Sequence, residues 1–168
     1  GIGSQSEPSS NAITWFALIN PWSATIDSTT TCWVATSMPT SSGPISVAVL
    51  GPNVAASGGG VFATGLHTSS IVRSAINLNE ATAGGAIAAR LLARLIVSDT
   101  TISGNSASAE GGGITTNGIV TLRNATVANN RTTGGAAGVG GGINAFERGV
   151  YLFANTLFSN NVVVGSGA

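Results

Sequence analysis

Apolar and polar residues alternate in short runs along this chain. The run at residues 118–127, GIVTLRNATV, sets Val120 and Leu122 against polar neighbours. The run at residues 149–157, GVYLFANTL, shows the same alternation. Alternation with a period of two predicts β-strands that bury one face.

The strand pattern repeats about every 26 residues. Glycine pairs or triplets that precede an apolar residue begin at positions 58, 84, 111 and 140, at intervals of 26, 27 and 29 residues. A second marker, an asparagine after a strand, keeps the same period at Asn53, Asn79, Asn105, Asn130 and Asn160. Two independent markers with one period predict stacked repeats. We expect these asparagines to form a hydrogen-bonded ladder at one corner of the stack.

Alignment on the asparagines places apolar residues in three columns. The columns are Ile71, Val97, Leu122 and Leu152; Ile76, Ile102, Val127 and Leu157; and Val61, Ile87, Ile114 and Ile143. Three short strands per repeat, with each column in register, predict an all-β fold, a right-handed parallel β-helix (a solenoid) of about five coils. Residues 44–168 would form the coils, and residues 1–43 an irregular N-terminal segment that caps the first coil.

The segment at residues 84–99, GGAIAARLLARLIVSD, competes with this interpretation. It is rich in alanine, leucine and arginine, which favour a helix. As a strand, it would place Leu91 and Leu95 inward and Arg90 and Arg94 outward together. Its register with the neighbouring repeats favours the strand.

Charged residues make up only 7% of the chain, and six arginines balance six acidic residues. A neutral chain has no basic field to attract nucleic acid, so we expect no nucleic-acid partner. The longest apolar candidate, AITWFALI at residues 12–19, is too short to span a membrane. Between coils, Arg73 is expected to pair with Asp99.

The pattern GGGI…VTLRNATVANN…GGGI resembles bacterial right-handed parallel β-helix proteins of the polymorphic outer-membrane protein and pectate-lyase-like superfamily, over residues 44–168. The resemblance implies an extracellular or outer-membrane, cell-surface location. It also implies one of two functions. The first is a non-catalytic, adhesin-like or passenger-like segment that contacts a glycan or a host or cell-surface protein. The second is a pectate-lyase-like enzyme that acts on acidic polysaccharide with Ca²⁺.

Residues suited to catalysis are few. Calcium takes six to eight oxygen ligands, several of them carboxylates, yet the acidic residues form no Asp-x-Asp pair and share no column. Glu80 and Glu110 lie near successive glycine turns, where a glycoside hydrolase would need paired carboxylates, and we interpret them as solvated turn residues. The single His67 and the single Cys32 cannot build a metal site from several such ligands. We therefore assign no catalytic residue, metal ligand or cofactor.

These observations favour a non-catalytic structural or binding segment. The residues that we expect at contact surfaces are Arg90, Arg94, Arg123, Tyr151 and Phe153. The longer turn at residues 131–139, RTTGGAAGV, is expected to display a loop. A third interpretation, ice binding, follows from the alignment of Thr101, Thr126 and Thr156, although Ala75 in the preceding repeat keeps this array short.

Overall fold

The computed structural model describes residues 49–66, 68–134 and 138–164, together with strand residues 15–16, 32–36 and 45–46. In these ranges the regular secondary structure is β-strand, and every strand pairing is parallel. None of the described segments is a helix that could cross a bilayer. The structure confirms the predicted all-β parallel solenoid.

The strands form four parallel sheets that run along the stack. The first sheet contains β1 (Trp15–Phe16), β2 (Cys32–Thr36), β6 (Val61–Thr64), β10 (Ile87–Arg90), β14 (Ile114–Thr116) and β18 (Ile143–Ala145). The second contains β3 (Ile45–Ser46), β7 (Thr68–Val72), β11 (Arg94–Ser98), β15 (Ile119–Arg123) and β19 (Val150–Ala154). The third contains β4 (Val49–Leu50), β8 (Ala75–Asn77), β12 (Thr101–Ser103), β16 (Thr126–Ala128) and β20 (Leu157–Ser159). The fourth contains β5 (Val54–Ser57), β9 (Glu80–Ala83), β13 (Ser106–Glu110), β17 (Arg131–Thr132) and β21 (Val162–Val163).

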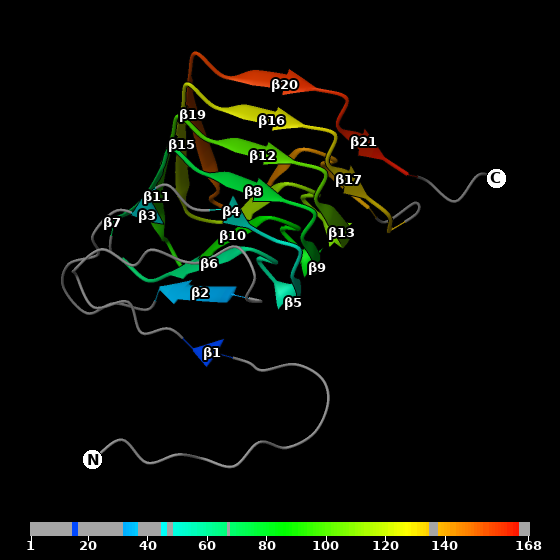
Figure 1. Ribbon diagram of the computed structural model, residues 1–168, viewed down its shortest axis with the longest axis horizontal. Coiled ribbons are helices and arrows are strands. Elements are labelled where there is room, and N and C mark those ends of the chain that lie inside the picture. Colours follow the sequence, from blue (N-terminus) through cyan, green and yellow to red (C-terminus); the bar gives the residue numbers. More distant parts are fainter. Residues whose placement is uncertain are drawn as a thin grey trace, which may run out of the picture.

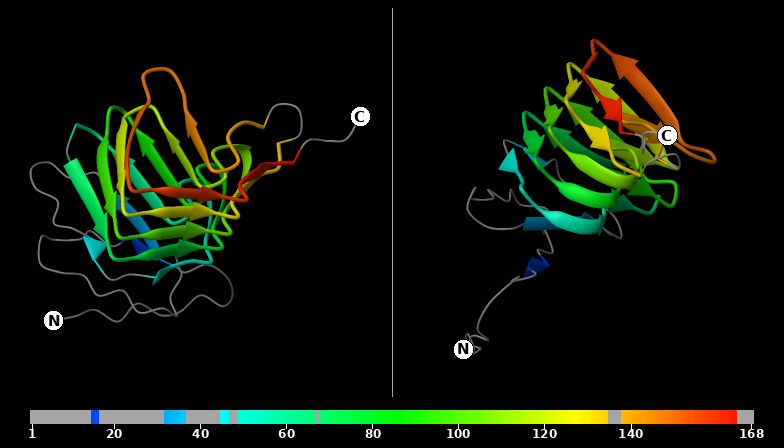
Figure 2. Two further views of the ribbon diagram at one scale, coloured as in Figure 1. Left: turned by 90° about the horizontal axis from the view of Figure 1, so that it is seen from above. Right: turned by 90° about the vertical axis from the view of Figure 1, so that its right-hand side faces the viewer.

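Each turn of the solenoid therefore has four strands, not the three expected, because a further short strand follows each ladder asparagine. Three turns, β6–β9, β10–β13 and β14–β17, have a strand layer on both sides. The strands β2–β5, with β1 beyond β2 in the first sheet, and β18–β21 form the outer layers, so the enclosed turns are fewer than the five coils expected. Figure 1 shows β8, β12, β16 and β20 above one another, with β1 near the opposite end, and Figure 2 shows the turns superposed.

The core fills the inside of the turns with the predicted columns. Ile71, Val97 and Leu122 lie in register, as do Ile76, Ile102 and Val127. The column that follows the glycines, Val61, Ile87, Ile114 and Ile143, is in register throughout. In the enclosed turns every member of these columns is at most 1% exposed. Burial of one strand face is what the period of two predicted.

The predicted register is wrong by one residue in β19 and β20. Leu122 pairs with Phe153 rather than Leu152, and Val127 pairs with Phe158 rather than Leu157. The last repeat has one more residue than the alignment allowed, and a slip of one residue exchanges the two faces of a strand. Leu152 and Leu157 consequently lie on the outer face.

Residues 84–99 form two strands joined by a sharp turn, which confirms the strand interpretation. Leu95 and Val97 in β11 are buried, as predicted. The expectation for Leu91 is wrong: Leu91 and Leu92 adopt positive φ angles of 52° and 62° at the corner between β10 and β11, and both side chains are exposed.

The glycine runs form the corner between the fourth sheet and the first. Gly111 has a φ of 60°, a conformation that glycine adopts without steric cost. At Gly112, a Cβ atom would lie 2.3 Å from the backbone oxygens of Arg131 and Gly141. The close stacking of successive turns thus requires glycine at this position.

Two strands of the predicted N-terminal segment, β1 and β2, extend the first sheet, with β2 paired to β6. The other residues of segment 1–43, and His67, lie outside the described residues. The boundary at residue 43 and the capping role remain predictions.

Candidate functional site

Four of the five predicted asparagines form a ladder between the third and fourth sheets. The Nδ2 atom of each donates to the Oδ1 atom of the next: 2.8 Å from Asn53 to Asn79, 3.0 Å from Asn79 to Asn105, and 2.9 Å from Asn105 to Asn130. The backbone N–H groups of Asn79 and Asn105 donate to the same oxygens. All four side chains are buried. The ladder thus satisfies polar groups at a corner that water does not reach.

The fifth ladder position is Asn161, not Asn160. Asn130 donates from its Nδ2 atom to Oδ1 of Asn161 at 3.0 Å. Asn160 is exposed and has a φ of 51°, like Asn129 at 55°. Each of the asparagine doublets at 129–130 and 160–161 consists of a corner residue with a positive φ angle followed by a ladder residue. Alignment of these two doublets was the sequence signal for the correct register.

A second, exposed row of polar residues runs along the corner between the second and third sheets. Arg73, Asp99, Asn124 and Asn155 all have φ angles between 47° and 51°. Asn124 donates to Asp99 at 3.1 Å, and Asn155 donates to Asn124 at 2.8 Å. Among the described residues Arg73 and Asp99 form no ion pair, because Asp99 instead accepts a hydrogen bond from the turn above.

The threonine array expected for ice binding does not form in the described turns. Thr101 pairs with Thr126, but Thr126 pairs with Leu157. Thr156 instead directs its hydroxyl to the carbonyl oxygens of Leu122 and Ala154. The same one-residue slip explains this correction.

Side chains from three parts of the chain converge on the outer surface of the first sheet. Arg90 Nη2 lies 3.0 Å from Glu110 Oε1, and Asn144 Nδ2 donates to Glu110 Oε2 at 2.8 Å. The Arg90 guanidinium lies 4.4 Å from the centre of the Phe146 ring, within cation–π range. We call these four residues the Arg90 cluster. The Arg90 and Glu110 side chains are 22% and 24% exposed, so solvent and a ligand can reach both.

Tyr151, predicted at a contact surface, points into the stack below this cluster. Its hydroxyl lies 3.1 Å from the carbonyl oxygens of Ile114 and Asn144. Burial raises the pKa of Tyr151 well above its ordinary value, and the nearby Glu110 carboxylate raises it further. The phenol therefore stays neutral and donates its proton to a backbone carbonyl.

The other predicted contact residues do not gather in one place. Arg94 begins β11 and Arg123 ends β15, so the two exposed arginines lie at opposite ends of these two adjacent strands. Glu80 pairs in register with Ser106, whereas Glu110 pairs with Ala83, so these two carboxylates do not share a column. Within the described ranges, no three His, Cys, Asp or Glu side chains lie close enough to hold a metal ion.

The expected display loop is fixed at its base. Thr132 is buried, and its Oγ1 accepts a hydrogen bond from the Gly112 N–H at 3.0 Å. Residues 135–137 of this loop lie outside the described residues.

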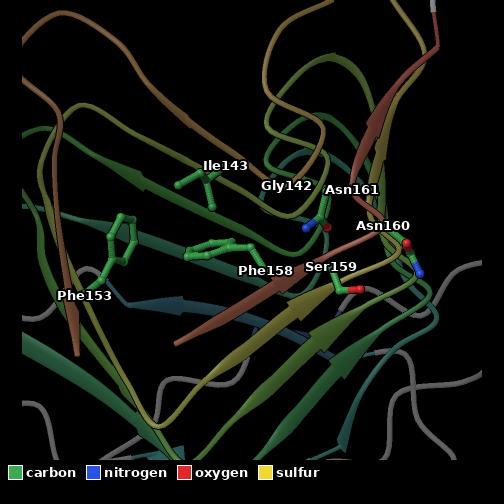
Figure 3. A pocket seen from close by; sticks show the side chains of 7 residues that line it. All are labelled: Gly142, Ile143, Phe153, Phe158, Ser159, Asn160 and Asn161. Atoms are coloured by element: carbon green, nitrogen blue, oxygen red, sulfur yellow. The ribbon is translucent and has the colours of Figure 1, made fainter. Parts of the chain in front are cut away.

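A hollow lies at the outer side of the last layer. Figure 3 shows the rings of Phe153 and Phe158 directed toward Ile143, with Ser159 and Asn160 directed away from them. The two rings meet edge to face at 5.1 Å, and Phe153 stacks on Tyr151 at 5.7 Å. The hollow exposes the end of the core, because β18–β21 have no further strand beyond them in the described chain.

Comparison with family models, curated proteins and solved structures gives no match to this chain.

Proposed function

We propose that this chain is a non-catalytic structural and binding segment, secreted or displayed at the cell surface. It would resemble the adhesin-like and passenger-like members of the polymorphic outer-membrane protein group. The observation that carries the proposal is the asparagine ladder. It links the turns with buried side-chain hydrogen bonds that continue from Asn53 to Asn161.

The ladder supports a structural role because it adds to the backbone pairing of every turn. Four parallel sheets already join each turn to the next, and each sheet is continuous over the enclosed turns. A fold built this way is extended, and each turn contacts only its neighbours. Such a rod can present side chains from successive turns at fixed spacing.

The Arg90 cluster supports a binding role at the side of this rod. It combines a guanidinium, an amide and an aromatic ring, groups that contact sugar hydroxyls, peptide groups and sugar ring faces. Both carboxylate oxygens of Glu110 already accept hydrogen bonds, from Arg90 and Asn144. A carboxylate held in this way positions its neighbours and is poorly suited to act as a free general base.

A binding screen tests this proposal. The purified chain is applied to immobilised glycans and to extracellular proteins, and hits are measured again with Phe146→Ala and with Arg73→Ala, a change at an exposed arginine outside the expected contact residues. We expect Phe146→Ala to weaken binding about tenfold or more through loss of the ring, and Arg73→Ala to leave it unchanged. Equal loss in both variants would place the contact elsewhere.

The same preparation tests the alternative, a pectate-lyase-like enzyme. Polygalacturonate is incubated with the full chain and Ca²⁺, and unsaturated products are followed by their ultraviolet absorbance. We expect no product above the chain-free control. Calcium-dependent product formation would overturn the non-catalytic proposal.

A further inference from the structure

Two buried polar atoms near the Arg90 cluster have no hydrogen-bond partner in the described part of the chain. They are Oγ1 of Thr115, in β14, and Oδ1 of Asn117, which follows β14. Buried polar side-chain atoms are nearly always hydrogen-bonded, so an unpartnered one requires an explanation. The position of these two atoms indicates that they belong to a binding site.

Thr115 lies beneath the Arg90 cluster. Ile114 packs in the core, so the next residue along the strand, Thr115, faces outward. Thr115 is in register with Asn144, and a Cβ atom on Gly111, which follows Glu110, would lie 2.9 Å from its Cβ. Although it faces outward, Thr115 is 0% exposed. The longer side chains of the cluster, which lie on either side of it, therefore cover it.

Asn117 lies between the two ends of the cation–π contact. The registers of β10, β14 and β18 place Arg90, Asn117 and Phe146 at equivalent positions of three successive turns. The Arg90 guanidinium reaches the Phe146 ring, so it spans the turn that contains Asn117. Asn117 Nδ2 donates to Oε2 of Glu147 at 3.5 Å, which directs the amide nitrogen outward and leaves the oxygen on the buried side.

We propose that the Arg90 cluster, with the two buried atoms beneath it, binds a neutral sugar residue of a glycan. This inference rests on the proposed binding function and names its ligand class. In the complex the Arg90 side chain leaves the Phe146 ring, because a partly exposed ion pair and a surface cation–π contact hold it only weakly. The apolar face of the sugar then packs on Phe146, and two sugar hydroxyls reach Thr115 and Asn117.

The chemistry of the two buried atoms favours a hydroxyl group over a carboxylate. Asn117 Oδ1 can only accept a hydrogen bond, and the Thr115 hydroxyl can donate or accept one. A sugar hydroxyl can do both, whereas an ionised carboxylate has no proton to donate to Asn117. The contacts at this place already include two carboxylates, Glu110 and Glu147, and one guanidinium, Arg90. An acidic sugar would add a third carboxylate, and a neutral sugar does not.

NMR titration of the isotope-labelled full chain with disaccharides tests the inference. The neutral probes are lactose, maltose and mannobiose, and the acidic probe is digalacturonate. We expect at least one neutral disaccharide to shift the side-chain amide signals of Asn117 and Asn144 and the Nε–H signal of Arg90. The side-chain amide of Asn105, in the buried ladder, should not shift.

Two adjacent threonines provide a matched pair of variants. Thr115→Val removes a hydroxyl that has no partner in the fold, so it should leave the urea midpoint unchanged or raise it. It should weaken binding of the sugar about tenfold, the loss of one hydrogen bond. Thr116→Val removes a hydroxyl that donates to the Ala89 carbonyl and accepts from the Gly118 N–H. It should lower the urea midpoint and leave sugar binding unchanged. If it does not fold, Thr101→Val, at an exposed threonine, replaces it as the binding control.

Four results would overturn the inference. The first is a shift of these signals by digalacturonate alone, and the second is no shift with any neutral probe. The third is equal weakening of binding by Thr115→Val and its control. The fourth is a lower urea midpoint or loss of folding in Thr115→Val, which would mean that the hydroxyl has a partner in the folded chain. The proposed function fails separately, when the screen of glycans and extracellular proteins gives no hit.

Discussion

Replacing Asn130 with alanine removes a central member of the asparagine ladder. The Asn130 side chain makes four hydrogen bonds and is fully buried. Its Oδ1 accepts from the backbone N–H and the Nδ2 of Asn105, and its Nδ2 donates to the Ile102 carbonyl and to Asn161. Alanine leaves the Asn105 N–H without its acceptor in a site closed to water.

The cost follows from these bonds. At about 1 kcal/mol for each of the four, the substitution lowers the free energy of unfolding by about 4 kcal/mol. A domain has a total stability of about 5–15 kcal/mol, so the loss would be between about a quarter and four fifths of it. The neighbouring Asn129 offers a matched control, because it is exposed and occupies a left-handed corner. Asn129→Ala should cost about 1 kcal/mol, the penalty for a left-handed alanine.

Urea unfolding followed by far-ultraviolet circular dichroism measures both variants. We expect Asn130→Ala to be about 3 kcal/mol less stable than Asn129→Ala, as the difference of the two costs. Equal stabilities would refute the reasoning, because they would mean that the buried amide contributes no more than an exposed one.

Three further predictions concern other parts of the fold. Gly112→Ala should lower the free energy of unfolding by about 3 kcal/mol or more, because its Cβ would overlap two backbone oxygens. Gly104→Ala should lower it by about 1 kcal/mol, the penalty for a left-handed alanine, and urea unfolding compares the two variants. Tyr151 is the only tyrosine, so the tyrosinate absorbance reports it alone. The pKa of Tyr151 is raised in the folded chain, so its contribution to stability is present below its ordinary pKa of 10.0 and is lost as the pH rises above that value. Tyrosinate absorbance should therefore appear only when the chain unfolds. A gradual increase of tyrosinate absorbance in the folded chain would contradict this prediction. Arg90→Ala should cost at most about 1 kcal/mol by urea unfolding, because its ion pair with Glu110 is partly exposed; a much larger loss would contradict a surface role.

The fold was predictable from the sequence because the stacked turns repeat its signals. The glycine runs mark a corner where no Cβ fits, as Gly112 shows. The asparagines mark a buried corner that needs an amide able to donate and accept. Apolar columns such as Ile76, Ile102 and Val127 then follow from the alternation within strands.

The last layer was mispredicted for a local reason. The sequence offers both Asn160 and Asn161 as the ladder residue, and the choice moves every side chain of β19 and β20 to the other face. Leu152 and Phe153 are both apolar, so burial preference did not separate the two registers. In the structure the hydrogen bonds from Asn130 to Asn161 distinguish the two registers, and in the sequence the signal was the match between the doublets at 129–130 and 160–161.

The Arg90 cluster could not be predicted from the sequence alone. Arg90 lies 20 residues before Glu110, and Glu110 lies 34 residues before Asn144. Neither spacing equals the repeat, so no column brings these residues together. The glycine corner places the end of β13 near β10 and β18. This proximity can be predicted only when the number of strands in each turn is known.

Disulfide cross-linking tests the winding of the chain most directly. In a chain without its native cysteine (Cys32→Ser), Thr101→Cys and Thr126→Cys are introduced at partner positions of adjacent turns. Their Cα atoms are expected about 4.8 Å apart, within disulfide range. Thr101→Cys with Leu157→Cys is the control, two turns apart at roughly 9.6 Å and out of range. We predict rapid oxidation of the first pair and none of the second; failure of the first pair to cross-link in a folded chain would contradict the solenoid.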